Sequence, residues 1–246
     1  MPVLRGPVDV PRPVLLHTWG VERLGDPHPV LGSFGYYVPQ DAVAELTRQC
    51  LRLLAELGLA TGDSLTREFR DTLRTLAQPG RELYCWSSFA DPEQDRACLV
   101  AERDGEAVEL QVQGDVVSIG PADSRRLVEA FVASLPDVPA ARVRPLTVDR
   151  AEFEQRGETG LDDPLAQPGA ADELAKQLQA PRDAVHQLYG AVTSDGRRRR
   201  SRPMSAIDVS GAGRVLVLVD GHDRLHRLPG TPGVLAETLV ATWQSM

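Results

Sequence analysis

The sequence has few of the features that mark membrane, disulfide-bonded or nucleic-acid-binding proteins. Its 246 residues include three cysteines, Cys50, Cys85 and Cys98, which form no CxxC pair, so we expect neither a disulfide framework nor a zinc knuckle. The longest purely aliphatic run covers only residues 215–219, whereas a membrane span needs roughly 20 apolar residues. Lysine occurs once, and the net charge of −8 opposes a generic nucleic-acid binder, which needs a basic footprint.

Signals for targeting and catalysis are also missing. Prolines at positions 2, 7, 11 and 13 break the apolar stretch that a secretory signal needs, and we therefore expect a cytoplasmic protein. The sequence contains no GxGxxG after a strand, no P-loop, no HExxH and no GxSxG. His222 and His226 lie four residues apart on a predicted hairpin, but a metal site would need a third ligand such as Asp220 or Asp223. We predict no catalytic residue, no cofactor and no metal.

Hydrophobic periodicity divides the first half of the chain into helices and strands. Apolar residues recur at helical spacing over 39–58 and again over 64–79, where Ser64 is a candidate N-cap. Period-two patterning then predicts strands at 83–89, 97–101, 108–112 and 116–119. Asp104-Gly105 is a hairpin signal within this run. A helix with Pro121 in its first turn follows and carries apolar residues up to Leu135.

The same order of elements returns in the second half. A helix near 172–179 precedes predicted strands at 185–193, 204–209, 214–219 and 225–228, and a last helix follows Pro232. Each half is therefore a helix, a four-stranded meander and a helix. We predict an α+β fold, a quasi-two-fold repeat of this unit with a central antiparallel sheet flanked by helices.

The two halves are predicted to form one domain over residues 1–246. The halves cover 64–135 and 170–246, and an acidic linker near 136–169 joins them. An irregular, proline-rich opening precedes the first half. Residues 152–173 contain seven acidic side chains and one arginine among several glycines and prolines. Few apolar groups there offset the entropy of ordering the chain, so we expect part of this stretch to be mobile.

Two features suggest contact with another protein. The strand 83–89 has bulky side chains on both faces, so Trp86 and Phe89, beside the polar loop 91–95, are candidates for interface residues; core packing is the alternative for Trp86. The run Arg197–Arg200 follows an Asp-Gly turn and fits a solvated strand edge, an anionic surface or an acidic partner. The candidate partner-binding residues are Trp86, Ser88, Phe89, Glu93, Arg96, His186, Tyr189 and Arg198.

Several motifs occur in an order that resembles one protein family. They are LLHTW at Leu15–Trp19, LRTLAQP at Leu73–Pro79, PDVP at Pro136–Pro139, and QLYGAV at Gln187–Val192 before the arginine run. Over nearly its whole length the chain resembles the EspG family, the cytoplasmic chaperones of ESX (type VII) secretion in actinobacteria. The resemblance implies a quasi-two-fold α/β fold and binding to the helical tip of the PPE subunit in a PE–PPE heterodimer. It implies no cofactor and no catalytic residue.

Three hypotheses about function follow. The first is a non-enzymatic chaperone, a monomer or weak homodimer, that keeps a PE/PPE-type client soluble and binds neither nucleic acid nor membrane. The second is a small-molecule enzyme with a site between the sheets, which would require a deep pocket with converging titratable residues. The third is a binder of anionic surfaces through Arg197–Arg200.

Overall fold

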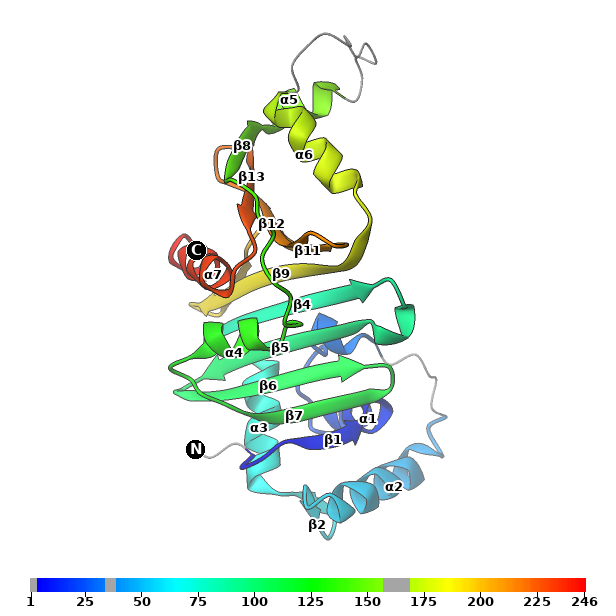
Figure 1. Cartoon of the computed structure of the whole chain (residues 1–246). Helices are drawn as coiled ribbons and strands as arrows, with labels where there is room; N and C mark the ends of the chain where they lie inside the picture. The colour runs from blue at the N-terminus through cyan, green and yellow to red at the C-terminus, as the bar shows by residue number, and fades with distance from the viewer. Residues whose placement is uncertain (1–3, 34–38, 157–168) are drawn as a thin grey trace.

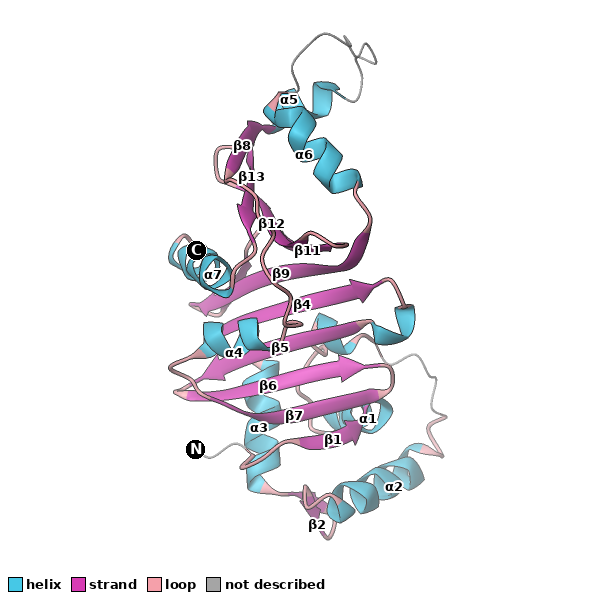
Figure 2. Ribbon diagram, in the orientation of Figure 1, coloured by secondary structure: helices cyan, strands magenta, loops and turns pink. Residues whose placement is uncertain are grey.

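A large antiparallel sheet organises the chain. The computed structural model describes residues 4–33, 39–156 and 169–246, and within them eleven strands join into this sheet (Figures 1 and 2). In spatial order ten of them are β1 (Val8–Pro11), β7 (Val116–Ala122), β6 (Glu106–Gln113), β5 (Arg96–Arg103), β4 (Arg81–Phe89), β9 (Arg182–Ser194), β11 (Met204–Val209), β12 (Gly213–Val219), β13 (Arg224–Pro229) and β8 (Leu146–Asp149). The eleventh, β10 (Arg197–Arg200), pairs with the end of β9 on the edge that β11 also uses.

The strands follow from alternation and from tight turns. In β6 the side chains of Val108, Leu110 and Val112 are buried while those between them are partly exposed, as expected when one face of a strand is packed. Asp104 and Gly105 both have positive φ, 53° and 84°, which is the geometry of a type I′ turn in a two-residue hairpin loop. Asp195-Gly196 forms the corresponding turn between β9 and β10.

Helices cover both faces of the sheet. They are α1 (Arg12–Val21), α2 (Val43–Glu56), α3 (Arg67–Ala77), α4 (Leu127–Ala133), α5 (Arg150–Arg156), α6 (Ala170–Gln179) and α7 (Pro232–Gln244). Figure 1 shows α4 and α7 in front of the sheet, with α1 and α3 behind it. Within the described residues, none of these helices combines the length and the apolar character that crossing a bilayer demands.

Each face of the sheet has its own core. Leu15 and Trp19 of α1 and Phe69 and Leu73 of α3 pack against one face of β4–β7. The opposite face packs against α4 and α7 through a second set of side chains, among them Phe131, Leu235 and Leu239. At the β8 end of the sheet, α6 packs on the strands through Leu174. The short hairpin of β2 (Ala60–Thr61) and β3 (Ser64–Leu65) packs against α2.

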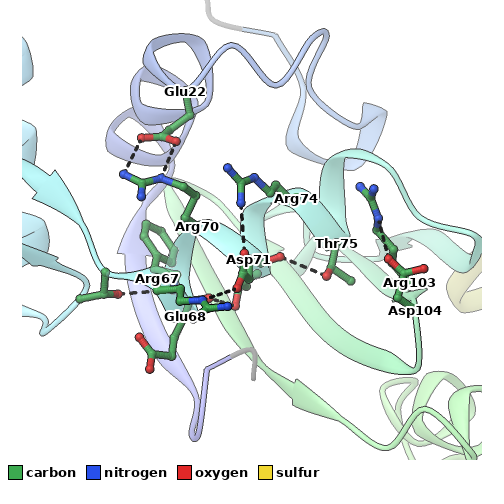
Figure 3. Close-up of polar contacts among 12 residues, drawn as sticks. Glu22, Arg67, Glu68, Arg70, Asp71, Arg74, Thr75, Arg103 and Asp104 are labelled. Atoms are coloured by element: carbon green, nitrogen blue, oxygen red, sulfur yellow. Dashed lines mark hydrogen bonds and ion pairs between the residues drawn. The ribbon is translucent and has the colours of Figure 1, made fainter. Parts of the chain in front are cut away.

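One ion pair joins α3 to the end of α1, and two more lie within α3 (Figure 3). Arg70 Nε lies 2.9 Å from Glu22 Oε2, immediately after the end of α1. Arg74 and Arg67 lie 3.2 and 3.7 Å from the two carboxylate oxygens of Asp71. The latter two arginines are largely exposed, so their pairs with Asp71 contribute little stability. The Glu22–Arg70 pair joins two helices and thereby helps to orient α3 over the sheet.

The predicted fold class and all eight predicted meander strands are confirmed. The mixed α+β architecture has a large antiparallel sheet flanked by helices, and the two meanders meet where β4 pairs with β9. The quasi-two-fold repeat and the division into halves at 64–135 and 170–246 stay predictions.

Three local predictions were wrong. The proline-rich opening is regular rather than irregular: it forms β1 and α1, because Pro13 occupies the first turn of α1, where a missing N–H removes no helical hydrogen bond. The N-cap of α3 is Thr66, whose hydroxyl accepts from Phe69 N–H, while Ser64 belongs to β3. Pro121 lies in β7 rather than in a helix; it sits beyond the last residue of β7 that pairs with β1.

The acidic linker is more structured than its composition indicates. It contributes β8, which pairs with β13 at the edge of the sheet, and α5. Residues 150–156 and 170–179 are helical, so the two ends of 152–173, part of which we expect to be mobile, form regular structure. The remainder of that expectation, on residues 157–168, lies outside the described residues.

Candidate partner interface

The candidate site begins with the pairing of β4 and β9 at the middle of the sheet. Tyr84 lies opposite Tyr189, and Trp86 lies opposite Gln187. Because side chains directly opposite each other in an antiparallel pair lie on the same face, these residues share the face that α1 and α3 cover further along the sheet. On this part of the face, aromatic side chains reach the surface.

Three aromatic rings pack together there. The rings of Tyr84 and Tyr189 are stacked, with centroids 5.1 Å apart and planes 9° apart. Trp86 meets both edge-on, at 5.4 Å from Tyr84 and 5.6 Å from Tyr189. Tyr84 is buried, whereas Trp86 and Tyr189 are half-buried and present part of their rings to solvent. Such offset and edge-on pairs stabilise one another beyond the burial of their area.

Two arginines of β10 lie over these rings. β10 pairs with β9 so that Arg200 is opposite Ala191 and Arg198 is opposite Thr193, on the tyrosine face. The guanidinium carbon of Arg198 is 5.5 Å from the Tyr84 centroid, and that of Arg200 is 5.3 Å from the Tyr189 centroid. We refer to Tyr84, Trp86, Tyr189, Arg198 and Arg200 as the aromatic–arginine surface.

A buried carboxylate fixes Arg198 within this surface. Glu82, on the same face of β4, accepts a hydrogen bond from Arg198 Nε, and its other oxygen lies 3.5 Å from His28 Nε2. Burial raises the pKa of Glu82, against the opposing effect of Arg198. Burial, together with the charge of Arg198, lowers the pKa of His28 to about 3, so His28 is neutral at pH 7. The cluster therefore contains one ion pair, and Arg200 is free of a carboxylate partner among the described residues.

The structure splits the eight predicted residues between two faces. Trp86, Tyr189 and Arg198 come together, and the exposed Ser88 follows Trp86 on the same side of β4. Phe89 and Arg96 lie on the opposite face, where the Arg96 guanidinium is 5.1 Å from the Phe89 ring centroid. Glu93 is in the exposed turn η2 (Pro92–Gln94) between β4 and β5.

His186 is completely buried and has no surface with which to touch a partner. Its Nδ1 lies 2.8 Å from Ser87 Oγ, and its Nε2 lies 3.1 Å from Asp208 Oδ2. Asp208 accepts two hydrogen bonds from Arg214, at 2.6 and 2.8 Å. We therefore drop His186 from the candidate interface.

This buried set of hydrogen-bonded side chains has the residue types of a Ser–His–Asp triad, but a substrate cannot reach it. Its four side chains are at most 5% exposed, and the guanidinium of Arg214 neutralises the Asp208 carboxylate. Burial alone would raise the pKa of Asp208, but the hydrogen bonds from His186 and Arg214 outweigh it and lower the pKa to about 2. No substrate can reach Ser87 in this packing, and the two meanders form one sheet rather than two with a site between them.

The histidine pair of the last hairpin is likewise held by internal contacts. His226 Nε2 lies 2.8 Å from Asp220 Oδ2, and Asp220 also accepts from the backbone N–H groups of His222 and Arg224. Throughout the described ranges, no group of three or more His, Cys, Asp or Glu side chains is arranged to hold a metal ion.

Sequence reasoning found Trp86, Tyr189 and Arg198 but missed their neighbours. Tyr84 and Arg200 each lie two residues from one of these, so strand alternation alone would have placed them on the same face. Glu82 follows by the same rule. His28 carries no such signal, because it comes from a segment far away in sequence.

Comparison with known proteins identifies a family and a shared fold. The model of the EspG family matches residues 14–241. A solved structure with a similar fold is that of the Mycobacterium tuberculosis type VII secretion system chaperone EspG5 in complex with the PE25–PPE41 dimer; the TM-score is 0.72 at 15% identity, over 96% of each chain. No curated protein is similar enough in sequence to count as a match.

Proposed function

Because the chain belongs to the EspG family, we propose that it is a cytoplasmic chaperone of type VII secretion, which binds a PE/PPE-type helical protein and keeps it soluble until export. The solved structure with the similar fold is a complex of such a chaperone with a PE–PPE dimer, which supports this class of client. The client contact is proposed to be the helical tip of the PPE-type subunit.

The observation that carries the proposal is the aromatic–arginine surface. Tryptophan, tyrosine and arginine are the residue types that dominate binding energy at protein interfaces. Here two half-buried rings are held rigidly by stacking and by β-sheet pairing, so little side-chain entropy is lost when a partner covers them. Arg200 lies on the Tyr189 ring and has donors available for carbonyl or carboxylate groups at a helix end.

We propose Trp86, Ser88, Tyr189 and Arg198 as client-binding residues, with Arg200 added. Arg198 acts chiefly by holding Tyr84 and Glu82 in place, because its guanidinium is already engaged by both. Phe89, Arg96 and Glu93 lie on the other face or in the adjacent turn and are left out.

A non-enzymatic role is supported by the packing around His186. The side chains of Ser87, His186 and Asp208 are sealed in the core, and Arg214 neutralises the Asp208 carboxylate. The arginine run gives less support to an anionic-surface binder, because the charge of Arg198 is already neutralised by Glu82. The exposed guanidinium groups of the run are then divided between the two faces of the sheet, with Arg200 on the tyrosine face and Arg197 and Arg199 on the other.

Co-expression with a PE–PPE pair encoded in the same genome tests the proposal. We expect the chain to co-elute with the pair in size-exclusion chromatography and to increase the soluble yield of the pair. Trp86→Ala combined with Tyr189→Ala should remove co-elution, and Arg96→Ala on the opposite face is the matched control. If the wild-type chain neither co-elutes with such a pair nor raises its solubility, the proposal fails.

A further inference from the structure

A second surface lies on the opposite face of the sheet, between α4 and α7. These two helices pack side by side over the strands in front of the sheet (Figure 1). A cleft of about 240 Å³ opens between them. Its apolar lining includes Leu127, Ala236 and Val240, and Val240 is 39% exposed at the surface. The volume is smaller than that of a typical drug-sized ligand site and is in the range for one or two apolar side chains.

One wall of the cleft is a rigidly held tryptophan. The indole N–H of Trp243 donates to the backbone carbonyl of Glu82, at 3.3 Å. Gly190 lies beneath the indole, and a Cβ at that position would be 3.1 Å from the indole nitrogen. The guanidinium carbon of Arg81 lies over the Trp243 ring, 5.7 Å from its centroid. Trp243 is therefore fixed in orientation while it is still half-exposed.

The rim of the cleft is basic. The guanidinium of Arg125 has no hydrogen-bond or carboxylate partner among the residues that the structure describes, and Arg81 uses only its Nε for Glu102. Arg199 extends this rim. Val192 of β9 pairs with Arg199 of β10 on one side and with Arg81 of β4 on the other, so the three side chains lie on the same face of the sheet. One carboxylate, that of Glu129, also lines the cleft. Arginine favours planar, bidentate contact with carboxylates.

We propose that this cleft is a docking site for an acidic peptide segment of a second protein, with one apolar side chain seated between α4 and α7 and carboxylates on Arg81 and Arg125. Charge complementarity favours such a segment, and the concave shape favours it over a lipid surface, which binds protruding apolar side chains. The site is separate from the aromatic–arginine surface, so a client and this second partner can be bound at the same time.

The test uses the full chain and a short synthetic peptide in which one leucine is flanked by aspartates and glutamates. A counterpart with asparagine and glutamine at those positions is the peptide control. The chain has three tryptophans, so the indole N–H signals in an NMR titration report the location of binding. Arg125→Glu is the test variant. Arg126→Glu is the matched control, because Arg126 is also exposed but does not line the cleft.

We expect the acidic peptide to shift the Trp243 signal saturably, and the amide counterpart to bind at least about tenfold more weakly. Arg125→Glu should weaken binding about tenfold or more, and Arg126→Glu by about twofold at most. The proposal is overturned if the Trp243 signal does not shift, if the two peptides bind with equal affinity, or if the two substitutions weaken peptide binding equally. It is also overturned by binding of vesicles of phosphatidylglycerol and phosphatidylcholine that depends on Arg125 while the peptide does not bind. None of these results bears on client binding, which is measured separately.

Discussion

Removing Arg214 tests the buried set of hydrogen-bonded side chains that connects the two halves of the sheet. The hydrogen bonds run from Ser87 in β4 through His186 in β9 and Asp208 in β11 to Arg214 in β12. In Arg214→Met the Asp208 carboxylate keeps, among the described side chains, only His186 as a hydrogen-bond partner. Taking one member out of a buried ion pair costs about 3–5 kcal/mol, so we expect the free energy of unfolding to fall by about that amount.

A double variant separates lost charge from lost packing. In Asp208→Asn/Arg214→Met both members of the ion pair are replaced by neutral side chains, and methionine fills much of the volume of the arginine stem. Because neutral replacements of buried ion pairs are often close to neutral in stability, we expect more than half of the loss to be recovered. Urea unfolding at pH 7, followed by circular dichroism, gives the three free energies. A double variant no more stable than Arg214→Met would refute the electrostatic explanation.

The pH dependence of stability provides an independent check. The folded-state pKa of Asp208 is about 2, against an ordinary value of 3.8. Because the pKa of Asp208 is lowered in the folded state, its carboxylate stabilises the fold at any pH at which it is ionised in both the folded and the unfolded protein. This contribution is lost as the pH falls from about 4 to about 2. Its size is about 2 kcal/mol. The double variant should lack this loss, and an equal loss in both proteins would contradict the assignment.

Substitutions at three other positions test packing, capping and the interface. Gly190→Ala should cost about 1–3 kcal/mol and lower the melting temperature, because its Cβ would crowd the indole of Trp243; an unchanged melting temperature would mean that α7 shifts without cost. Thr66→Ala should lose about 1 kcal/mol of unfolding free energy with the cap of α3, and Thr66→Ser should retain most of it. Trp86→Ala should weaken client binding at least about tenfold, with little loss of melting temperature. Normal binding by a strongly destabilised Trp86→Ala protein would instead place Trp86 in the core.

Much of the sheet was predictable because its signals are local. Alternating residues in β6 and the Asp-Gly turns specify hairpins within a few residues, without information from the rest of the chain. The pairing of β4 with β9 is different. It joins strands about a hundred residues apart, and no local pattern determines which strand edges meet. The edge strands β1 and β8 were missed for a related reason: each pairs with a strand that lies far along the chain, so no hairpin turn marks it.

The candidate site was predictable in part for the same reason. Trp86, Tyr189 and Arg198 stood out as bulky or charged residues on strands, and pairing brought them together. His186 was assigned to the interface because its partners could not be known. They come from three other strands, and only the folded sheet shows that Asp208 and Ser87 enclose it.

Client binding is tested most directly by the affinity of the purified chain for a purified PE–PPE pair from the same organism. We predict a saturable complex of one chain with one pair. Trp86→Ala combined with Tyr189→Ala should weaken this complex by about a hundredfold or more, and Arg96→Ala should leave it unchanged. A complex that forms equally well with both variants would contradict the assignment of the surface, and no complex with any such pair would contradict the function itself.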